Sequence, residues 1–505
     1  MQPDVFLEQL WYKKGGRRST IEVGDAWGDS GKGGIEAVLG PYFDVSARVQ
    51  GGANTGRTRH IRGADGQLYP FIFHLVPTLL ADGKMGIIGD AVLVEVARLV
   101  RELRDLIAIV GDLKAPLLVS KRAPIFLRYH SLLEGLLELV KGSAAVGTTG
   151  RGISPMIAGI DLRVGPLTGH LLDADLLRKW VKGFYDAFFP MLKEFELRMK
   201  GTEKEFSLAD MSPDNEVERL LADADFLRPY ITNIDPVLHD LMRRNVPVLF
   251  GMTQGYGLHV RGTYPFNSAT QSIAQAAAYC GGLPMHLFGP VILISKLFLT
   301  RVGEGPFPTG WWNRHDAEVF PELRPELFPG LPQFNQNAQE AFLQAKRDLI
   351  NAGSATKQDW AEHFEVLFNN RGSTTMRGRE VGGPDLYMTR CAAMVNGADC
   401  IALTQVDGLS GLNINLPIAT GYKIDGELVE PPTYPMTEEL DGVDVQEVCV
   451  RIDLEDTDIR GINSERDLPG CVHQLIRTYE RYAGVPVGII STSAGLDGKV
   501  LRSVA

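Results

Sequence analysis

The chain has 505 residues, which exceeds the roughly 100 to 200 residues of one ordinary domain, so several domains or one large domain with insertions are expected. Its net charge of -11 disfavours nonspecific nucleic-acid binding, which depends on Lys and Arg. The five cysteines form no Cys-x-x-Cys pair, so neither a disulfide framework nor a zinc knuckle is indicated. Without a signal-peptide pattern or a run of about 18 apolar residues, a cytoplasmic protein with no membrane segment is expected.

The first elements predict a strand, a loop and a helix in succession. Residues 1–19 are expected to form an extension that is either frayed or docked on the core. Residues 20–23 have strand character, and a glycine-rich turn, a helix over 35–39 and a strand over 43–49 follow them. Further short apolar runs bounded by glycine predict strands at 85–88, 247–250, 400–403 and 485–490.

Helical patterns lie between these strands, at 92–106, 171–199 and Leu386–Asn396. This alternation favours an α/β fold, with a large central and mostly parallel sheet surrounded by helices. The expected organisation is an extension, a nucleotide-binding core, an inserted subdomain and the C-terminal part of the core, over residues 1–19, 20–310, 311–370 and 371–505. A helical insertion near 171–245 is expected within the core.

The segment Gly28-Asp29-Ser30-Gly31-Lys32-Gly33 lies between a predicted strand and a predicted helix, where backbone N–H groups can surround a phosphate. It differs from a Walker loop, because Ala26 stands where the first glycine is required and Gly33 where Ser or Thr would bind magnesium. A purely structural turn is the alternative. Asp29 beside Lys32 favours phosphate chemistry, since a carboxylate for metal binding or proton abstraction then adjoins a cation.

Further motifs follow this loop in a fixed order along the chain. They are Gln50-Gly51-Gly52-Ala53-Asn54-Thr55-Gly56-Arg57-Thr58, Val146-Gly147-Thr148-Thr149-Gly150-Arg151-Gly152-Ile153, Gly262-Thr263-Tyr264-Pro265, the run from Thr300 to Thr309, Thr374-Thr375-x-Arg377-x-Arg379, Thr404-Gln405-Val406-Asp407 and Ile489-Ile490-Ser491-Thr492. Together with the loop they resemble the adenylosuccinate synthetase family, whose fold is P-loop-NTPase-like. The resemblance implies a GTP-dependent, magnesium-requiring homodimeric ligase that joins L-aspartate to IMP, or to a related purine monophosphate, through a 6-phosphoryl intermediate. Its products would be adenylosuccinate, GDP and phosphate.

The resemblance also implies roles for individual residues. The catalytic set would be Asp29, Lys32, Gln254 and Arg57, the last in place of the family's proton-donor His; Asp29 would take the purine N1 proton and bind magnesium together with the Gly56 carbonyl. The GTP-binding residues would be Gly31, Lys32, Gly33, Arg379, Gln405, Asp407, Ser491 and Ser493. The purine monophosphate would contact Asp29, Asn54, Thr149, Gln254, Ser268 and Arg377. Aspartate would contact Thr374, Thr375, Arg377 and Arg379.

Several positions depart from the family pattern. Arg57 cannot cycle as a general acid, although it can neutralise charge at a phosphate oxygen; His60 is an alternative donor, and a surface position is the simpler interpretation of it. Ser30 replaces a family Glu, and Gln405 replaces a Lys while keeping a hydrogen-bonding amide. Residues 154–164 lack the arginine that reaches the partner subunit's nucleotide site.

Three functions remain open at this point. The first is the adenylosuccinate synthetase reaction. The second is a ligase of the same mechanism with another carbonyl acceptor or amine. The third is a weakly catalytic, guanine-nucleotide-binding regulatory paralogue, which the loss of the His favours and the retention of Asp29, Lys32 and two arginines opposes.

Overall fold

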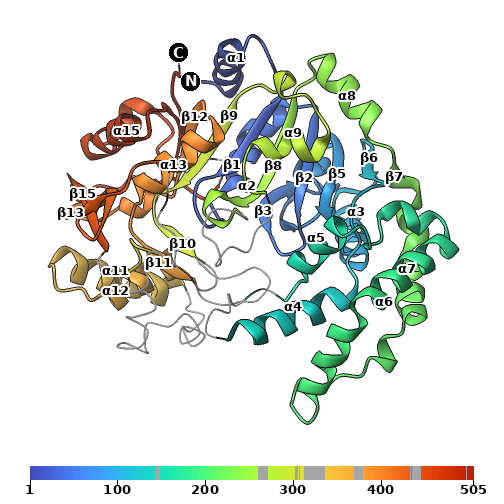
Figure 1. The fold of residues 1–505 in the computed structure, drawn as a ribbon. Helices are drawn as coiled ribbons and strands as arrows, with labels where there is room; N and C mark the ends of the chain where they lie inside the picture. The colour runs from blue at the N-terminus through green and yellow to red at the C-terminus, as the bar shows by residue number, and fades with distance from the viewer. Residues whose placement is uncertain are drawn as a thin grey trace.

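The computed structural model describes residues 1–142, 148, 150–259, 271–301, 305, 307–311, 336–368, 379–432, 434, 445–495 and 497–504. Its centre is a ten-stranded sheet in the order β17-β16-β12-β9-β1-β8-β2-β5-β6-β7 (Figure 1). These strands are β1 Thr20–Gly24, β2 Val45–Gly52, β5 Met85–Leu93, β6 Leu117–Ser120, β7 Ile231–Thr232, β8 Val248–Gly255, β9 Val291–Lys296, β12 Cys400–Thr404, β16 Val487–Ser491 and β17 Lys499–Leu501. Neighbouring strands of this sheet run parallel except β16 and β17. The predicted mostly parallel sheet is confirmed.

Alternate residues of the central strands enter different apolar cores, as the two-residue period of a strand requires. Leu293 of β9 joins the larger core, while Ile292 and Ile294 join the core beneath the N-terminal helix. Strands β1, β2, β9, β12 and β16 are buried along their whole length. Burial on both faces explains the apolar runs of β9, β12 and β16, whereas β1 and β2 also bury polar side chains such as Glu22 and Gln50.

Helices cover both faces of the sheet. Those of the described residues are α1 Pro3–Lys13, α2 Lys32–Leu39, α3 Val96–Val110, α4 Arg128–Lys141, α5 Ile153–Asp161, α6 Ala174–Met199, α7 Pro213–Leu227, α8 Asp235–Arg243, α9 Gln275–Gly281, α11 Gln336–Asn351, α12 Lys357–Phe368, α13 Leu386–Asn396 and α15 Gly470–Ala483. The helix predicted over 92–106 begins later, because β5 continues through Leu93 before the chain turns. Helix α2, in contrast, begins earlier than predicted, at Lys32, three residues before its predicted start.

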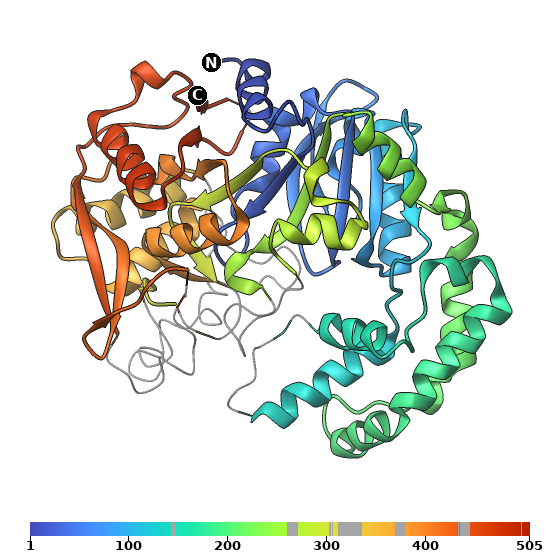
Figure 2. The same ribbon diagram turned by 45° about the horizontal axis from the view of Figure 1, so that its top comes forward.

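The N-terminal extension is docked on the core. Phe6 and Leu10 of α1 are fully buried, and the Trp11 indole donates a hydrogen bond of 3.0 Å to Thr20 Oγ1 on β1. Both termini lie side by side in Figures 1 and 2, and the Met1 amino group donates to the Leu501 carbonyl at 3.3 Å. The N-terminal segment therefore packs on the core through α1 and is hydrogen-bonded to the last strand, β17, through Met1.

The helices α4, α6 and α7 form an arm beside the sheet, as Figure 2 shows. Asp173 caps α6 by accepting hydrogen bonds from the Asp175 and Leu176 amides, both at 3.0 Å. Leu177, Val181 and Phe184 of α6 are buried. Their spacing gives the helix one apolar side that packs on its neighbours.

Smaller sheets complete the described fold. They are the pair β3 Arg57–Arg62 and β4 Leu68–Phe73, the pair β10 Leu299–Arg301 and β11 Glu380–Gly382, and the three strands β13 Asn415–Ile424, β14 Glu427–Leu428 and β15 Val445–Asp453. Within the expected insertion 311–370, Phe364 of α12 is fully buried and stacks on Phe298 with ring centroids 3.9 Å apart. The described helices of this region thus share the main core. No helix in the described ranges has the length and apolarity needed to cross a membrane.

Candidate active site

Most of the predicted site residues that the structure describes follow the carboxyl ends of parallel strands. Gly24 ends β1, Gln254 lies at the end of β8, and Asn54 follows β2. On the other side of β1, Gln405 follows β12 and Ser491 ends β16. Because these ends share one edge of the sheet, the sequence-distant motifs meet there, as ligand sites of open α/β sheets do.

The loop between β1 and α2 is shaped by its glycines. Gly28 and Gly31 have φ angles of 95° and 81°, a region that L side chains rarely adopt. A Cβ atom at Gly24 would lie 2.9 Å from both the Gln254 carbonyl oxygen and Ser30 Oγ. The loop therefore lies directly against β8, and α2 begins at this edge, where the positive end of a helix favours an anion.

Lys32 is the buried cation of the loop. Its Nζ donates hydrogen bonds to the Gln254 carbonyl at 2.7 Å and to Ser30 Oγ at 3.0 Å. Burial, reinforced by the charge of Arg57, lowers the pKa of Lys32 to about 8, while Glu22 and Asp29 oppose that shift. Ser30 differs from the family motif, and its hydroxyl accepts a hydrogen bond from Lys32, which the motif and this chain share.

Asp29 is paired with a second predicted site residue. Its Oδ2 lies 2.7 Å from Arg379 Nη1, with the Asp29 side chain 38% exposed and the Arg379 side chain 10% exposed. Asp29, Gln254 and Gln405 all adopt positive φ, at 50°, 59° and 59°. A positive φ in a non-glycine residue is costly and is concentrated at functional sites. Three of the six non-glycine residues with positive φ in the described ranges are thus predicted site residues.

Lys296 at the end of β9 belongs to the same site, and the sequence motifs missed it. It is 2% exposed, and its Nζ donates to Thr300 Oγ1 at 2.8 Å. Burial, with Arg379 adding to the effect, lowers the pKa of Lys296 to about 7, and Asp29 and Glu365 act in the opposite direction. A lysine at the end of a buried strand whose first four residues are apolar was the available signal.

The predicted guanine loop touches the phosphate loop. Thr404 Oγ1 donates to the Ser30 carbonyl at 2.8 Å, and a Cβ at Gly31 would lie 3.3 Å from the Thr404 side chain. Burial raises the pKa of Asp407, against the charges of Lys499 and Arg460. The two loops are therefore hydrogen-bonded and packed against each other.

The C-terminal motif lies beside the guanine loop. Ser491 Oγ donates to the Ser493 carbonyl at 3.0 Å, and Lys499 Nζ donates to the same carbonyl at 2.7 Å. A Cβ at Gly34 of α2 would lie 3.8 Å from the Lys499 side chain. Lys499 is thus a second cation near the loops that the motifs did not include, and burial lowers its pKa to about 8.

Arg57 is held by protein groups. Its Nη1 donates to Glu22 Oε1 at 2.6 Å and pairs with Glu36 Oε1, and its Nη2 donates to the Met252 carbonyl at 2.5 Å. The hypothesis that it neutralises a phosphate oxygen therefore gains no support from this geometry. His60 is exposed, on the face of β3 opposite to Arg57, as the simpler interpretation of that residue predicted.

The remaining predicted residues divide into two groups. Asn54 and Gly56 are half-buried beyond β2, with Asn54 Oδ1 3.5 Å from the position of a Cβ at Gly52. Outside the described residues lie Thr149, Ser268, Thr374, Thr375 and Arg377. The catalytic and binding roles assigned to all the predicted site residues remain predictions.

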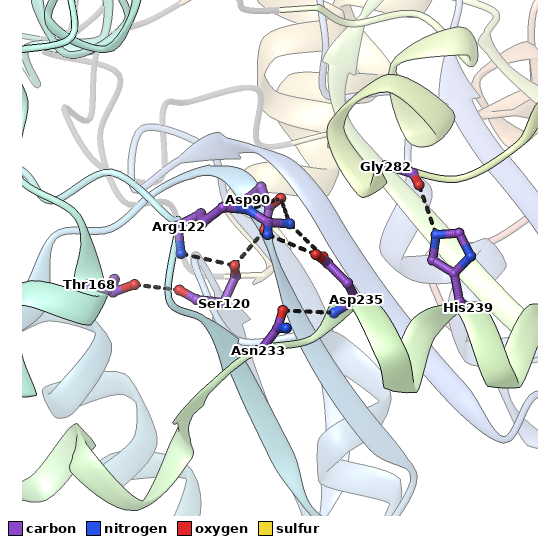
Figure 3. Close-up of polar contacts among 8 residues, drawn as sticks. All are labelled: Asp90, Ser120, Arg122, Thr168, Asn233, Asp235, His239 and Gly282. Atoms are coloured by element: carbon purple, nitrogen blue, oxygen red, sulfur yellow. Dashed lines mark hydrogen bonds and ion pairs between the residues drawn. The ribbon is translucent and has the colours of Figure 1, made fainter.

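A second polar cluster lies near the β5, β6 and β7 end of the ten-stranded sheet (Figure 3). Arg122 binds Asp90 through Nε at 2.9 Å and Asp235 through Nη1 at 2.7 Å, while Ser120 Oγ also donates to Asp90. The arginine is 48% exposed, and both of its partners are carboxylates. The cluster joins β5, β6 and the start of α8, so we interpret it as a structural clamp.

A buried lysine in the first turn of a helix at the carboxyl edge of a parallel sheet is the arrangement with which α/β enzymes bind phosphorylated ligands. The family model described as adenylosuccinate synthetase matches residues 21–499. The chain therefore belongs to the adenylosuccinate synthetase family.

Individual relatives agree with this assignment. The adenylosuccinate synthetase of Myxococcus xanthus is 32% identical over 96% of this chain and 98% of its own length. That of Desulfosudis oleivorans is 31% identical, over 95% and 98%. The solved structure of fully ligated adenylosuccinate synthetase from Plasmodium falciparum has a TM-score of 0.75 and 23% identity, covers 96% of this chain and all of its own, and shows the shared fold.

Proposed function

We propose that this chain is a GTP-dependent ligase that forms a C–N bond between L-aspartate and IMP in purine nucleotide biosynthesis. The products are adenylosuccinate, GDP and phosphate. Membership of the adenylosuccinate synthetase family along residues 21–499 carries the proposal. The geometry supports it, since Asp29, Lys32 and Arg379 gather at the sheet edge. Of the three functions left open by the sequence, the family assignment supports the first.

In the first proposed step, Asp29 accepts the N1 proton of IMP, so that electron density moves to O6, which attacks the γ-phosphorus of GTP. Lys32 and the first amides of α2 hold the transferred phosphoryl group. Phosphoryl transfer depends mainly on positioning and on neutralising charge, which a buried ammonium group supplies well. The bond from the γ-phosphorus to the β,γ-bridging oxygen breaks, and GDP leaves.

In the second proposed step, the aspartate amine attacks C6 and phosphate leaves with the O6 oxygen. Arg379 suits the anionic co-substrates, because its planar guanidinium can hold two oxygens at once. It already binds the carboxylate Asp29 at 2.7 Å in the structure. We propose that the ligands share or take over this contact, together with Thr374, Thr375 and Arg377.

Magnesium is proposed as the cofactor. One carboxylate oxygen of Asp29 and the Gly56 carbonyl are hard oxygen donors that would hold the ion, with a nucleotide's phosphates and water as further ligands, and the other Asp29 oxygen would stay available to accept the proton. Asp29 is 38% exposed, which leaves the carboxylate accessible from the open side of the loop. The bound ion would neutralise phosphate charge.

The assembly and location are also proposals. We propose a homodimer, on the family resemblance, which light scattering would check. We propose a cytoplasmic location, because the five cysteines are free thiols and four of them are buried.

The deciding experiment incubates the purified protein with GTP, magnesium, IMP and aspartate and measures adenylosuccinate and inorganic phosphate. Equal amounts of both products are expected, and none when IMP or aspartate is omitted. A panel of purine monophosphates tests the acceptor in parallel. Turnover with another purine but not with IMP would overturn the proposed acceptor, and GTP binding without turnover would overturn the enzyme assignment.

A further inference from the structure

Arg57 joins four elements beneath the phosphate loop. It begins β3, donates to the Met252 carbonyl of β8 at 2.5 Å and to Glu22 of β1 at 2.6 Å, and pairs with Glu36 of α2. The exposed fractions of the Glu22, Glu36 and Arg57 side chains are 2%, 1% and 10%. Its guanidinium lies on the backbone of β8, since a Cβ at Gly251 would be 2.6 Å from Nη1.

Charge holds this arrangement in place. Two carboxylates buried to this extent need a cation, because removing an ion from water is expensive unless it is paired and hydrogen-bonded. Arg57 is the guanidinium that both of them contact. Moving it toward a bound phosphate would leave Glu22 and Glu36 without that partner.

The link to the reaction runs through α2. Glu36 and Lys32 are four residues apart on this helix, so their side chains lie on the same face, one turn apart. Gly33 lies against β3 as well, since a Cβ there would be 2.4 Å from the Thr58 carbonyl oxygen. Fixing Glu36 therefore fixes the rotation of α2 and the direction of Lys32.

We infer that Arg57 is a positioning residue, which acts through Glu36 to orient α2 and Lys32, and that it does not contact the transferred phosphoryl group. The inference rests on the proposed function. It assigns to this arginine a task different from the charge neutralisation that its place in the motif suggested. The position that holds the proton donor in the family thus holds, in this chain, a residue that fixes the orientation of α2.

The test uses Glu36, whose side chain faces Arg57 under the loop. In Glu36→Leu the anchor of α2 is lost, and kcat/KM for GTP should fall about ten- to a hundredfold, the size expected for a small misplacement of a reacting group. Glu36→Gln keeps the shape and one acceptor oxygen and should fall only about two- to threefold. If Arg57 acted on the phosphate, weakening its protein partners would release it, and both variants would keep or raise kcat/KM.

A double-mutant cycle gives a second measurement. Under this inference, Arg57→Met combined with Glu36→Leu should lose no more kcat/KM than Arg57→Met alone, because both changes break one linkage. Losses that multiply would overturn it. Thermal unfolding of each variant selects an assay temperature at which all are folded, and the conservative Gln variant decides the sign if the others do not fold. Wild-type protein that makes no adenylosuccinate would instead indicate failure of the proposed function.

Discussion

Arg379 Nη1 lies 2.7 Å from Asp29 Oδ2, so the proposed base and a proposed ligand-binding arginine are ion-paired in the structure. The pair crosses from the phosphate loop to the segment that precedes β11. Under the proposed function, the carboxylates and phosphates of the substrates would compete with Asp29 for this guanidinium. The relationship makes separate predictions for its two members.

Asp29→Asn keeps the shape of the side chain and removes its charge and its ability to accept a proton. Turnover should fall at least about a thousandfold, as for loss of a general base together with a metal ligand. The melting temperature should change little, because the side chain is 38% exposed. Product formation under saturating substrates measures the effect, and rates near wild type would remove Asp29 from the mechanism.

Arg379→Lys keeps the positive charge and loses the planar fork. We expect KM for aspartate or GTP to rise about tenfold or more with a smaller change in kcat, because a single ammonium cannot bind two oxygens in the same geometry. Initial rates over a range of each substrate separate the two constants. An unchanged KM for both would exclude Arg379 from ligand binding.

Asp25, the first residue after β1, predicts a pH dependence of stability. It is fully buried, Thr389 Oγ1 donates to its Oδ2 at 2.8 Å, and burial raises its pKa from 3.8 to about 6. Between these values the folded protein holds a proton that the unfolded chain releases, so stability is full below the unfolded pKa and is lost as pH rises through the folded one. The loss amounts to about 3 kcal/mol near pH 7, from 1.36 kcal/mol per pKa unit.

Asp25→Asn removes this titration, since the amide is neutral at every pH. Relative to wild type, the variant should therefore gain stability between pH 4 and 7 and show a constant difference above that. Urea unfolding at several pH values measures it. Parallel stability profiles of the two proteins would show that Asp25 ionises normally in the fold.

Arg122→Met tests the clamp of Figure 3. The arginine is 48% exposed, so solvent screens its pairs with Asp90 and Asp235, and we expect a loss of only about 1 kcal/mol. Strands β8, β2 and β5 separate it from β1, and kcat/KM should stay near wild type. Arg178→Met is the matched control, because this arginine is similarly exposed, at 47%, but its partners Asp175 and Asp214 are 96% and 74% exposed, so its loss should cost almost nothing.

The sequence predicted elements best where local signals were complete. Helix α13 has its predicted bounds Leu386–Asn396, because Asp385 caps its first turn and Gly397 ends it in the left-handed region at φ 60°. The helix predicted over 92–106 was misplaced, since an apolar run continues a buried strand as readily as it starts a helix. The apolar pattern alone therefore does not show where β5 ends and α3 begins.

Candidate site residues could be chosen from the sequence where one motif carries both a carboxylate and a cation, and could not be chosen where distant elements meet. Asp29 and Lys32 could be chosen from one loop. The bond from Arg57 to Glu22 and Glu36 joins three elements, and neither glutamate belongs to a motif that marks it. Lys296 escaped notice for a related reason, since Asp29 and Arg379, whose charges act on its pKa, come near it only in the folded chain.

The hydrogen bond from Thr404 to the Ser30 carbonyl has a wider consequence. Under the proposed function, the two ends of one GTP molecule rest on loops that are bonded to each other. A mutation that changes the guanine-binding loop therefore also shifts the phosphate-binding loop. Base specificity and catalytic rate are then expected to change together. A lineage that changes its energy donor must then re-tune both loops at once.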